Sequence, residues 1–167
     1  MRLHGDRGDH QRAARLVIAI ERTGNRWRGN AHSGFAWGFF GPQATLFDAE
    51  GKQKLTHFLS SDPLGTARPT WLHSKDSSAI WGAVLASASS VTDPGTVAAG
   101  AIPWLLVEVV DGEPGPDGGD KLVDTTYIHR LSTSGGVAPA AGCAAALDVG
   151  KRALVPYATD YYFYRES

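Results

Sequence analysis

Two strand-like segments of the chain carry side chains that could move a proton or hold an anion. The first is KLTHFL (54–59), where His57 alternates with Leu55 and Leu59 on one side of an expected strand. Two roles are open for His57: a half-buried histidine with a hydrogen-bond partner, or a base or ligand-binding group in the mouth of a barrel. His57 is our first candidate for a functional site.

Arg130 is the candidate that could anchor an acidic ligand. It lies in TYIHRL (126–131), on the same side of the expected strand as Ile128. A guanidinium group can hold a carboxylate through two parallel hydrogen bonds in a fork geometry. The alternative is structural, namely an ion pair on the strand face with Glu108 or Asp124.

Aromatic side chains gather at the end of the sequence and could form the walls of a site. In DYYFYR (160–165), Tyr161 and Phe163 share one face, while Tyr162 and Tyr164 share the other. One pair should pack in the core, and the other should form a second buried face or an exposed platform for sugars, phenols or peptides. The candidate binding residues are His57, Trp71, Arg130 and Tyr161.

Two other polar segments have the composition of a functional site without its scaffold. WLHSKDSS (71–78) places His73 and Asp76 beside serines, but a catalytic triad needs partners that separate elements hold in place. HGDRGDH (4–10) has side chains that suit Zn²⁺ or Cu²⁺, but it lies at a chain end. We therefore expect no metal site and no cofactor, and we assign no catalytic residue.

The elements that must position these side chains are short β-strands. Runs with period-2 alternation are separated by Gly, Pro, Asp and Ser about every ten residues, which is typical of an antiparallel all-β sandwich or barrel. At most one or two short helices are expected, in 143–151 and in 9–21, although RLVIAIE (15–21) also fits a strand. We predict a single β domain over 35–167 and an atypical N-terminal segment over 1–34 that could be flexible.

Composition excludes several classes of protein. The chain of 167 residues is 43% hydrophobic and has a net charge of −1, so we expect a globular domain that does not bind nucleic acid. The longest apolar run, 101–107, is too short to span a membrane, and the N-terminus lacks the pattern of a secretory signal. The single cysteine, Cys143, should be buried and poorly reactive. Composition gives neither the compartment nor the oligomeric state.

The stretch TYIHRLSTSGGVAPAAGC (126–143) combines a strand with a glycine-rich end. Gly135 and Gly136 allow positive φ or a close backbone approach, as a corner of the fold requires. We interpret the stretch mainly as a structural corner. Its functional alternative is the rim of a pocket beside His57 and Arg130.

Five segments occur in an order and spacing that are specific as a set. They are FAWGFFGPQATLFDAEGK, RPTWLHSKDSSAIWG, GAIPWLLVEV, TYIHRLSTSGGVAPAAGC and VPYATDYYFYR. Over about 35–165 the chain thereby resembles the family called domain of unknown function 3455, found in bacteria and fungi. The resemblance implies an extracellular or periplasmic location and supplies no catalytic residue. The apolar strand that this family has before Trp37 is replaced here by TGNRWRGNAHSG (23–34), so a strand should be missing or replaced.

Two functions follow from these residues. The first is a non-enzymatic β-domain that binds a small ligand, a carbohydrate or a partner, which the aromatic content favours. The second is a cofactor-free hydrolase or isomerase with His57 as base and Arg130 or a tyrosine as helper. An exposed edge strand would indicate a third role, in self-association.

Overall fold

The β-prone runs of the sequence form eight strands. The structure is a computed structural model that describes residues 10–22, 35–139, 148 and 150–165. In this part of the chain, no helix is long and apolar enough to cross a membrane. The strands are β1 (His10–Arg22), β2 (Phe35–Phe47), β3 (Gln53–Ser61), β4 (Ala67–His73), β5 (Ala79–Ala88), β6 (Trp104–Glu113), β7 (Thr125–Gly135) and β8 (Arg152–Arg165).

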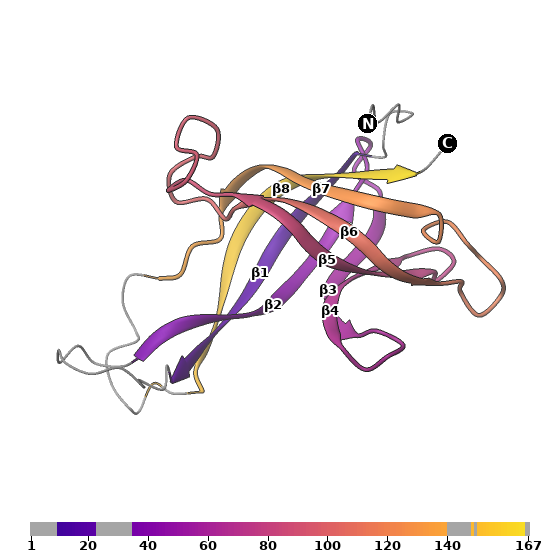
Figure 1. The fold of residues 1–167 in the computed structure, drawn as a ribbon, viewed down its shortest axis with the longest axis horizontal. Coiled ribbons are helices and arrows are strands. Elements are labelled where there is room, and N and C mark those ends of the chain that lie inside the picture. Colours follow the sequence, from indigo (N-terminus) through magenta and orange to yellow (C-terminus); the bar gives the residue numbers. More distant parts are fainter. Residues whose placement is uncertain (1–9, 23–34, 140–147, 149, 166–167) are drawn as a thin grey trace.

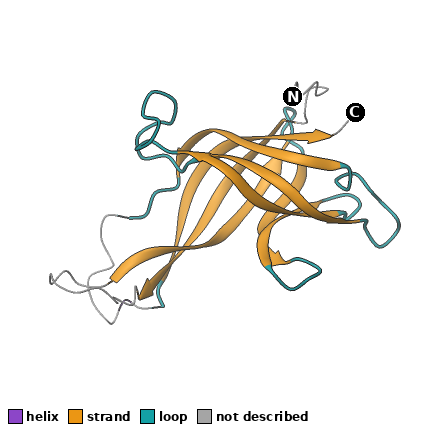
Figure 2. Ribbon diagram, in the orientation of Figure 1, coloured by secondary structure: helices purple, strands orange, loops and turns teal. Residues whose placement is uncertain are grey.

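The strands form one closed barrel in which each strand pairs with the next along the chain (Figures 1 and 2). All the pairings are antiparallel, and β1 closes the barrel by pairing with β8 as well as with β2. The all-β prediction is therefore confirmed, and of its two architectures the structure has the barrel.

β1 decides between the two interpretations of the N-terminal region. The helix considered for 9–21 is wrong, because residues 10–22 form a strand whose Ile18 lies opposite Phe39 of β2. The segment 23–34, where a strand was expected to be missing or replaced, lies outside the described residues, and the strand that precedes β2 in the barrel comes from 10–22. The division of the chain into 1–34 and 35–167 itself stays a prediction. Most of the other helix candidate, 143–151, lies outside the described residues, as does Cys143.

The interior face of the barrel follows from the period of two along each strand. In β8 the buried positions are Tyr157, Thr159, Tyr161 and Phe163, and the residues between them are more exposed. The prediction that one aromatic face of this strand is core is confirmed, and Tyr161 and Phe163 belong to that face.

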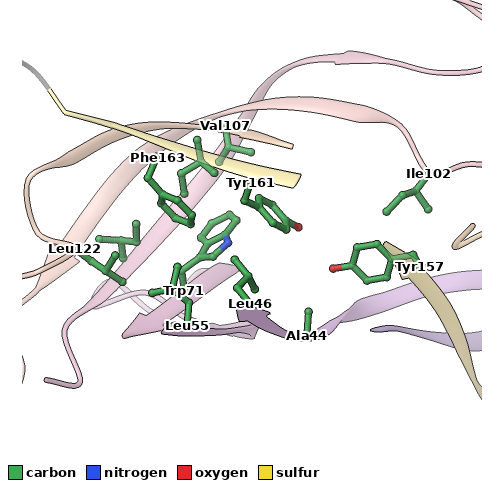
Figure 3. Packing of buried hydrophobic residues seen from close by; sticks show 12 residues of the cluster. Ala44, Leu46, Leu55, Trp71, Ile102, Val107, Leu122, Tyr157, Tyr161 and Phe163 are labelled. Atoms are coloured by element: carbon green, nitrogen blue, oxygen red, sulfur yellow. The ribbon is translucent and has the colours of Figure 1, made fainter. Parts of the chain in front are cut away.

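The core fills the barrel between its strands (Figure 3). Gly82 of β5 makes room for Trp71, because a Cβ there would lie 3.0 Å from the indole ring and 2.4 Å from a methyl group of Val107. The buried hydrophobic cluster consists of Ala44, Leu46, Leu55, Trp71, Ile80, Ile102, Val107, Leu122, Ile128, Tyr157, Tyr161 and Phe163.

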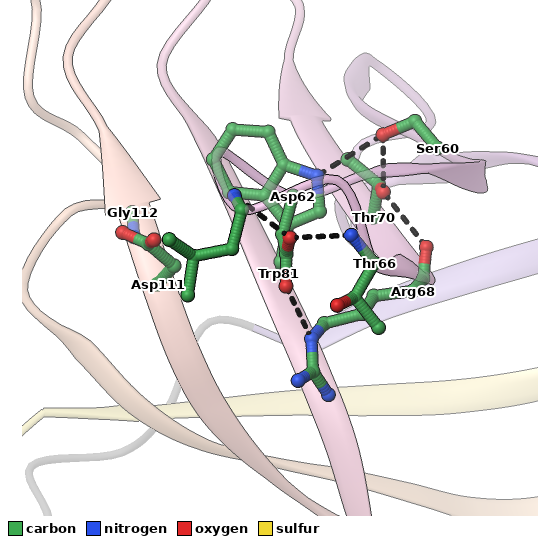
Figure 4. Close-up of polar contacts among 9 residues, drawn as sticks. Ser60, Asp62, Thr66, Arg68, Thr70, Trp81, Asp111 and Gly112 are labelled. Atoms are coloured by element: carbon green, nitrogen blue, oxygen red, sulfur yellow. Dashed lines mark hydrogen bonds and ion pairs between the residues drawn. The ribbon is translucent and has the colours of Figure 1, made fainter.

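A network of polar contacts on the outside of the barrel fixes the β3–β4 hairpin (Figure 4). Asp62 accepts hydrogen bonds from the backbone of the turn and pairs with Arg68 at 2.6 Å. Beside it, the Trp81 indole N–H donates to Ser60 Oγ at 3.1 Å, and Ser60 Oγ lies 2.7 Å from Thr70 Oγ1. This network holds β4 in place, and β4 carries Trp71 on its opposite, interior face.

Candidate functional site

His57 and Trp71 form a stacked pair inside the barrel. They lie opposite one another on β3 and β4, and their ring centroids are 4.2 Å apart with planes inclined by 12°. His57 Nδ1 is 2.8 Å from the Thr70 carbonyl oxygen. Since a carbonyl only accepts, Nδ1 carries the proton and Nε2 is the unprotonated nitrogen. His57 is thus a buried histidine with a hydrogen-bond partner, as the first of its two expected roles requires.

Burial decides the charge of His57. It lowers the pKa of this side chain to about 3; the hydrogen bond to Thr70 opposes the change, and the charge of Arg130 adds to it. The imidazole is therefore neutral at physiological pH.

Tyr161 of β8 completes an aromatic group with the stacked pair. Its ring meets His57 edge-on at a centroid distance of 5.6 Å and Trp71 at 6.1 Å. Edge-to-face contacts of this kind are favourable because the positive edge of one ring meets the negative face of the next. Three of the four predicted site residues are thus in mutual contact, and each is at most 3% exposed.

Three polar atoms in this region have no hydrogen-bond partner among the described residues. They are Trp71 Nε1 and the hydroxyl oxygens of Tyr157 and Tyr161. Figure 3 shows the two tyrosine hydroxyls pointing toward one another along the barrel. The two hydroxyls lie close enough to affect each other's pKa, and Arg130 affects that of Tyr161, but none of these approaches has the geometry of a hydrogen bond. Burial raises the pKa of both phenols, so each keeps its proton and can donate.

Arg130 of β7 lies directly opposite Tyr161 of β8, and residues so paired share one face of a sheet. Its Nε and Nη2 donate to the Pro103 carbonyl oxygen at 3.0 and 2.8 Å. The predicted structural alternative, a pair with Glu108 or Asp124, is wrong: the ion pairs of the described residues include neither. The same carbonyl also occupies the two guanidinium donors that were expected to hold a ligand carboxylate.

Five side chains inside the barrel form what we call the interior polar cluster. They reach one region of the barrel from four strands, and the charge of Arg130 influences the titration of three of the others. The cluster consists of His57, Trp71, Arg130, Tyr157 and Tyr161.

The glycine corner after β7 adjoins the cluster. Gly135 and Gly136 both have positive φ, 69° and 87°, and Ala101 bridges to Gly136. A Cβ on Gly136 would lie 2.4 Å from Ile102 and 3.2 Å from Tyr157 Cβ. The prediction of a close-packed corner is therefore confirmed for residues up to 139, and the corner brings Ile102 against Tyr157.

A second polar group, the Asp76 cluster, surrounds the turn after β4. It consists of His73, Asp76, Ser78 and the backbone of Lys121. His73 Nδ1 lies 3.0 Å from Asp76 Oδ1, and Ser78 Oγ donates to the same oxygen at 2.8 Å. In a catalytic triad the histidine lies between the nucleophile and the carboxylate, whereas here the carboxylate lies between the other two. The arrangement is structural.

Asp76 also holds the loop that connects β6 to β7. Lys121 N donates to Asp76 Oδ2 at 3.0 Å, and Leu122 N donates to Ser78 Oγ at 3.2 Å. A Cβ on Gly119 would lie 2.3 Å from Asp76 Cβ, so the loop passes tightly over the carboxylate. The contacts place Leu122 in the core, on the other side of Trp71 from Tyr157 (Figure 3).

The charge of Asp76 is stabilised where it lies. Burial alone would raise its pKa, but hydrogen bonds from Lys121 and from both donors of Ser78 outweigh that effect and lower it to about 2. The carboxylate stays ionised well below neutral pH.

Sequence reasoning missed Tyr157 as a member of the interior polar cluster and the Pro103 carbonyl as the acceptor for Arg130. Tyr157 lies four positions before Tyr161, and so on the same face of a strand, which is a signal that was present in the sequence. A backbone carbonyl carries no such signal. Among the described residues no group of three or more His, Cys, Asp or Glu side chains could hold a metal ion. Residues 4–9 of the HGDRGDH segment lie outside them.

Comparisons with known proteins bear on the family. No curated protein and no solved structure matches the chain. Residues 26–165 match the family described as "Protein of unknown function (DUF3455)", which covers well over half of the sequence and confirms the resemblance seen in its segments. The chain belongs to this family.

Proposed function

We propose that this protein binds a small molecule inside its barrel, at the interior polar cluster. The observation that supports the proposal is the set of three buried polar atoms without partners, on Trp71, Tyr157 and Tyr161. Nearly all buried polar groups in proteins are hydrogen-bonded, so three exceptions in one place point to a ligand or to ordered water as the partner.

The energetics favour a ligand that accepts hydrogen bonds. A buried donor without a partner costs about 1–3 kcal/mol, and a ligand that supplies the acceptor recovers that free energy on binding. The surroundings are otherwise apolar, with Ala44 and Ile102 near Tyr157 (Figure 3). Apolar walls with a few convergent polar groups are typical of small-molecule sites. A small ligand therefore fits this region better than a protein partner, and a carbohydrate is one of the classes to test.

The alternative function, a cofactor-free hydrolase or isomerase with His57 as base, has less support. A general base works best when its pKa is near the working pH, and burial lowers that of His57 to about 3. An imidazole of this kind can accept a hydrogen bond from a ligand through Nε2 but is a weak proton acceptor.

Two indole N–H groups provide a direct test with an internal control. Trp71 Nε1 has no partner among the described residues, whereas Trp81 Nε1 already donates to Ser60 on the outside of the barrel. Two-dimensional proton–nitrogen NMR resolves both signals, which Trp71→Phe and Trp81→Phe variants assign. We expect compounds from a panel of short-chain carboxylates, phenols and monosaccharides to shift the Trp71 signal and to leave the Trp81 signal unchanged.

Matched tyrosine variants identify the site. The double variant Tyr157→Phe/Tyr161→Phe should lose the Trp71 response, while Tyr164→Phe, which removes a hydroxyl from the outer face, should keep it. If no compound shifts the Trp71 signal, or if both indole signals shift together, binding inside the barrel is wrong.

We also propose that the protein acts outside the cytoplasm, in the periplasm or the extracellular space, as the family resemblance implies. Cell fractionation of the natural host, followed by detection with a specific antibody, tests this location. Recovery with the cytoplasmic fraction alone would contradict it.

A further inference from the structure

We infer that the interior polar cluster selects an anion, and that its ligand is a small monocarboxylate bound beside Arg130 between Tyr157 and Tyr161. This inference rests on the proposed function and adds the chemical class of the ligand. It depends on three further observations: the charge of Arg130, the excess of donors in the cluster, and the apolar residues around it.

The charge of Arg130 has no counter-ion among the described residues. The Pro103 carbonyl that accepts from Nε and Nη2 orients the guanidinium without neutralising it. A guanidinium has five N–H donors, so three remain after these two bonds. The titratable groups that this charge influences are His57, Tyr157 and Tyr161, and all three are neutral at physiological pH. Arg130 itself is half-buried, and toward these buried, neutral groups its charge attracts an anion more strongly than it would in water.

The cluster offers more donors than acceptors. Both tyrosine hydroxyls and the Trp71 indole are without a partner, and each can donate. Nδ1 of His57 already donates to Thr70, so this side chain adds only an acceptor, Nε2. A carboxylate has two oxygens that only accept, and it therefore matches the donor excess. An amide or alcohol of the same size brings donors of its own and no charge.

The surroundings of the cluster limit the ligand to one charged group. Ala44 and Ile102 lie near Tyr157 and are at most 8% exposed, and neither could solvate a second carboxylate. They suit a short hydrocarbon tail instead. Arg130 is the single cation influencing the cluster's titratable groups among the described residues, so the balance of charge also favours a monoanion.

The test compares three probes of equal chain length with the unmodified protein near neutral pH: butyrate, butyramide and 1-butanol. Affinity is measured from the shift of the Trp71 indole signal, with Trp81 as the internal control. We expect butyrate to bind about ten- to hundredfold more tightly than butyramide, the range that one charged hydrogen bond confers. Sodium chloride and sodium sulfate, titrated alone, show what the anionic charge contributes without the tail.

Arginine variants then locate the charge. Arg130→Met should reduce the preference for butyrate over butyramide to a few-fold, and Arg130→Lys should keep part of it because the charge remains. Arg68→Met is the control, since Arg68 pairs with Asp62 outside the barrel and should leave the preference unchanged. The comparison of probes on the unmodified protein stands even if Arg130→Met does not fold.

The outcomes separate this inference from the proposed function. Equal affinity for butyrate and butyramide would overturn the anion preference while leaving binding inside the barrel intact. Affinity for chloride or sulfate equal to that for butyrate would overturn the assignment to an organic acid. If none of the probes or of the wider panel shifts the Trp71 signal, the proposed function itself fails.

Discussion

The Asp76 cluster and the interior polar cluster belong to the same barrel but use their hydrogen-bonding groups in opposite ways. Around Asp76, the donors of Ser78 and Lys121 reach one carboxylate and the hydroxyl of Ser78 in turn accepts from Leu122. In the interior, the hydroxyls of Tyr157 and Tyr161 and the indole of Trp71 reach no acceptor among the described residues.

The difference separates a structural role from a binding role. A polar network with all its partners present lowers the free energy of the folded state and fixes a loop, and it has nothing left to offer a ligand. A buried group without its partner costs stability, and a protein keeps it where something else supplies the partner. Polarity alone would have placed both clusters in one class.

The largest expected effect is on the Asp76 side of this comparison. Asp76→Ala leaves the Ser78 and Lys121 donors without an acceptor and releases the loop that carries Leu122. We expect the free energy of unfolding to fall by about 2–3 kcal/mol, measured by urea denaturation. Asp117→Ala, an exposed carboxylate on the same loop, is the control and should change it by less than about 0.5 kcal/mol.

Acid should remove the stabilising contribution of the Asp76 carboxylate from the unmodified protein. The folded pKa of Asp76, about 2, is below its ordinary value of 3.8, so its stabilising effect is complete above about pH 4. It is lost as the pH falls toward 2 and the carboxylate takes up a proton. The gap in stability between Asp76→Ala and the unmodified protein should narrow over that range, and a constant gap would mean that the carboxylate's charge is not what matters.

The interior cluster should respond to pH over a different range. His57 is neutral in the folded protein because burial lowers its pKa from 6.5 to about 3, whereas the unfolded chain takes up a proton below 6.5. The contribution of His57 to the free energy of unfolding is therefore full above pH 6.5. It decreases as the pH is lowered, by about 1 kcal/mol between pH 6.5 and 5.5. His57→Gln should remove this part of the slope in denaturation experiments, and parallel curves for the two proteins would contradict it.

The smallest effect is the one that separates the clusters most directly. Tyr161→Phe removes a buried hydroxyl that has no partner. The desolvation cost that this recovers is offset by the small void left behind, so the free energy of unfolding should stay within about 0.5 kcal/mol of its original value or rise. Ser78→Ala removes a hydroxyl with two partners and should cost about 1 kcal/mol. If Tyr161→Phe proves as costly as Ser78→Ala in the absence of added ligand, the interior hydroxyl is bonded and the comparison fails.

Which side chains share a face of each strand could be predicted from the sequence, because the period of a β-strand is two. That period assigned Tyr161 and Phe163 to one face, and it put His57 on the same face as Leu55. The breakers every ten residues gave the all-β class, but they do not distinguish a sandwich from a barrel, since closure depends on the pairing of β1 with β8.

The partners of the site residues were harder to predict than their positions. Arg130 bonds to the Pro103 carbonyl from 27 residues away, and such a contact depends on register and backbone direction rather than on residue type. The order of contacts around Asp76 likewise depends on the turn geometry, where Ser77 has a positive φ of 58°. The role of His57, Trp71, Arg130 and Tyr161 in binding stays a prediction.

The pairing of β1 with β8 has a consequence for how the chain folds. Every other pairing joins neighbours along the sequence, whereas this one brings His10 opposite Tyr162 and so closes a loop of almost the whole chain. Closing so long a loop is entropically costly, so we expect the hairpins to form early and the seam to form late. Tyr157 and Tyr161 arrive on β8, and the interior polar cluster is therefore complete only when the barrel has closed. An unfinished barrel would carry two unpaired strand edges and an incomplete site.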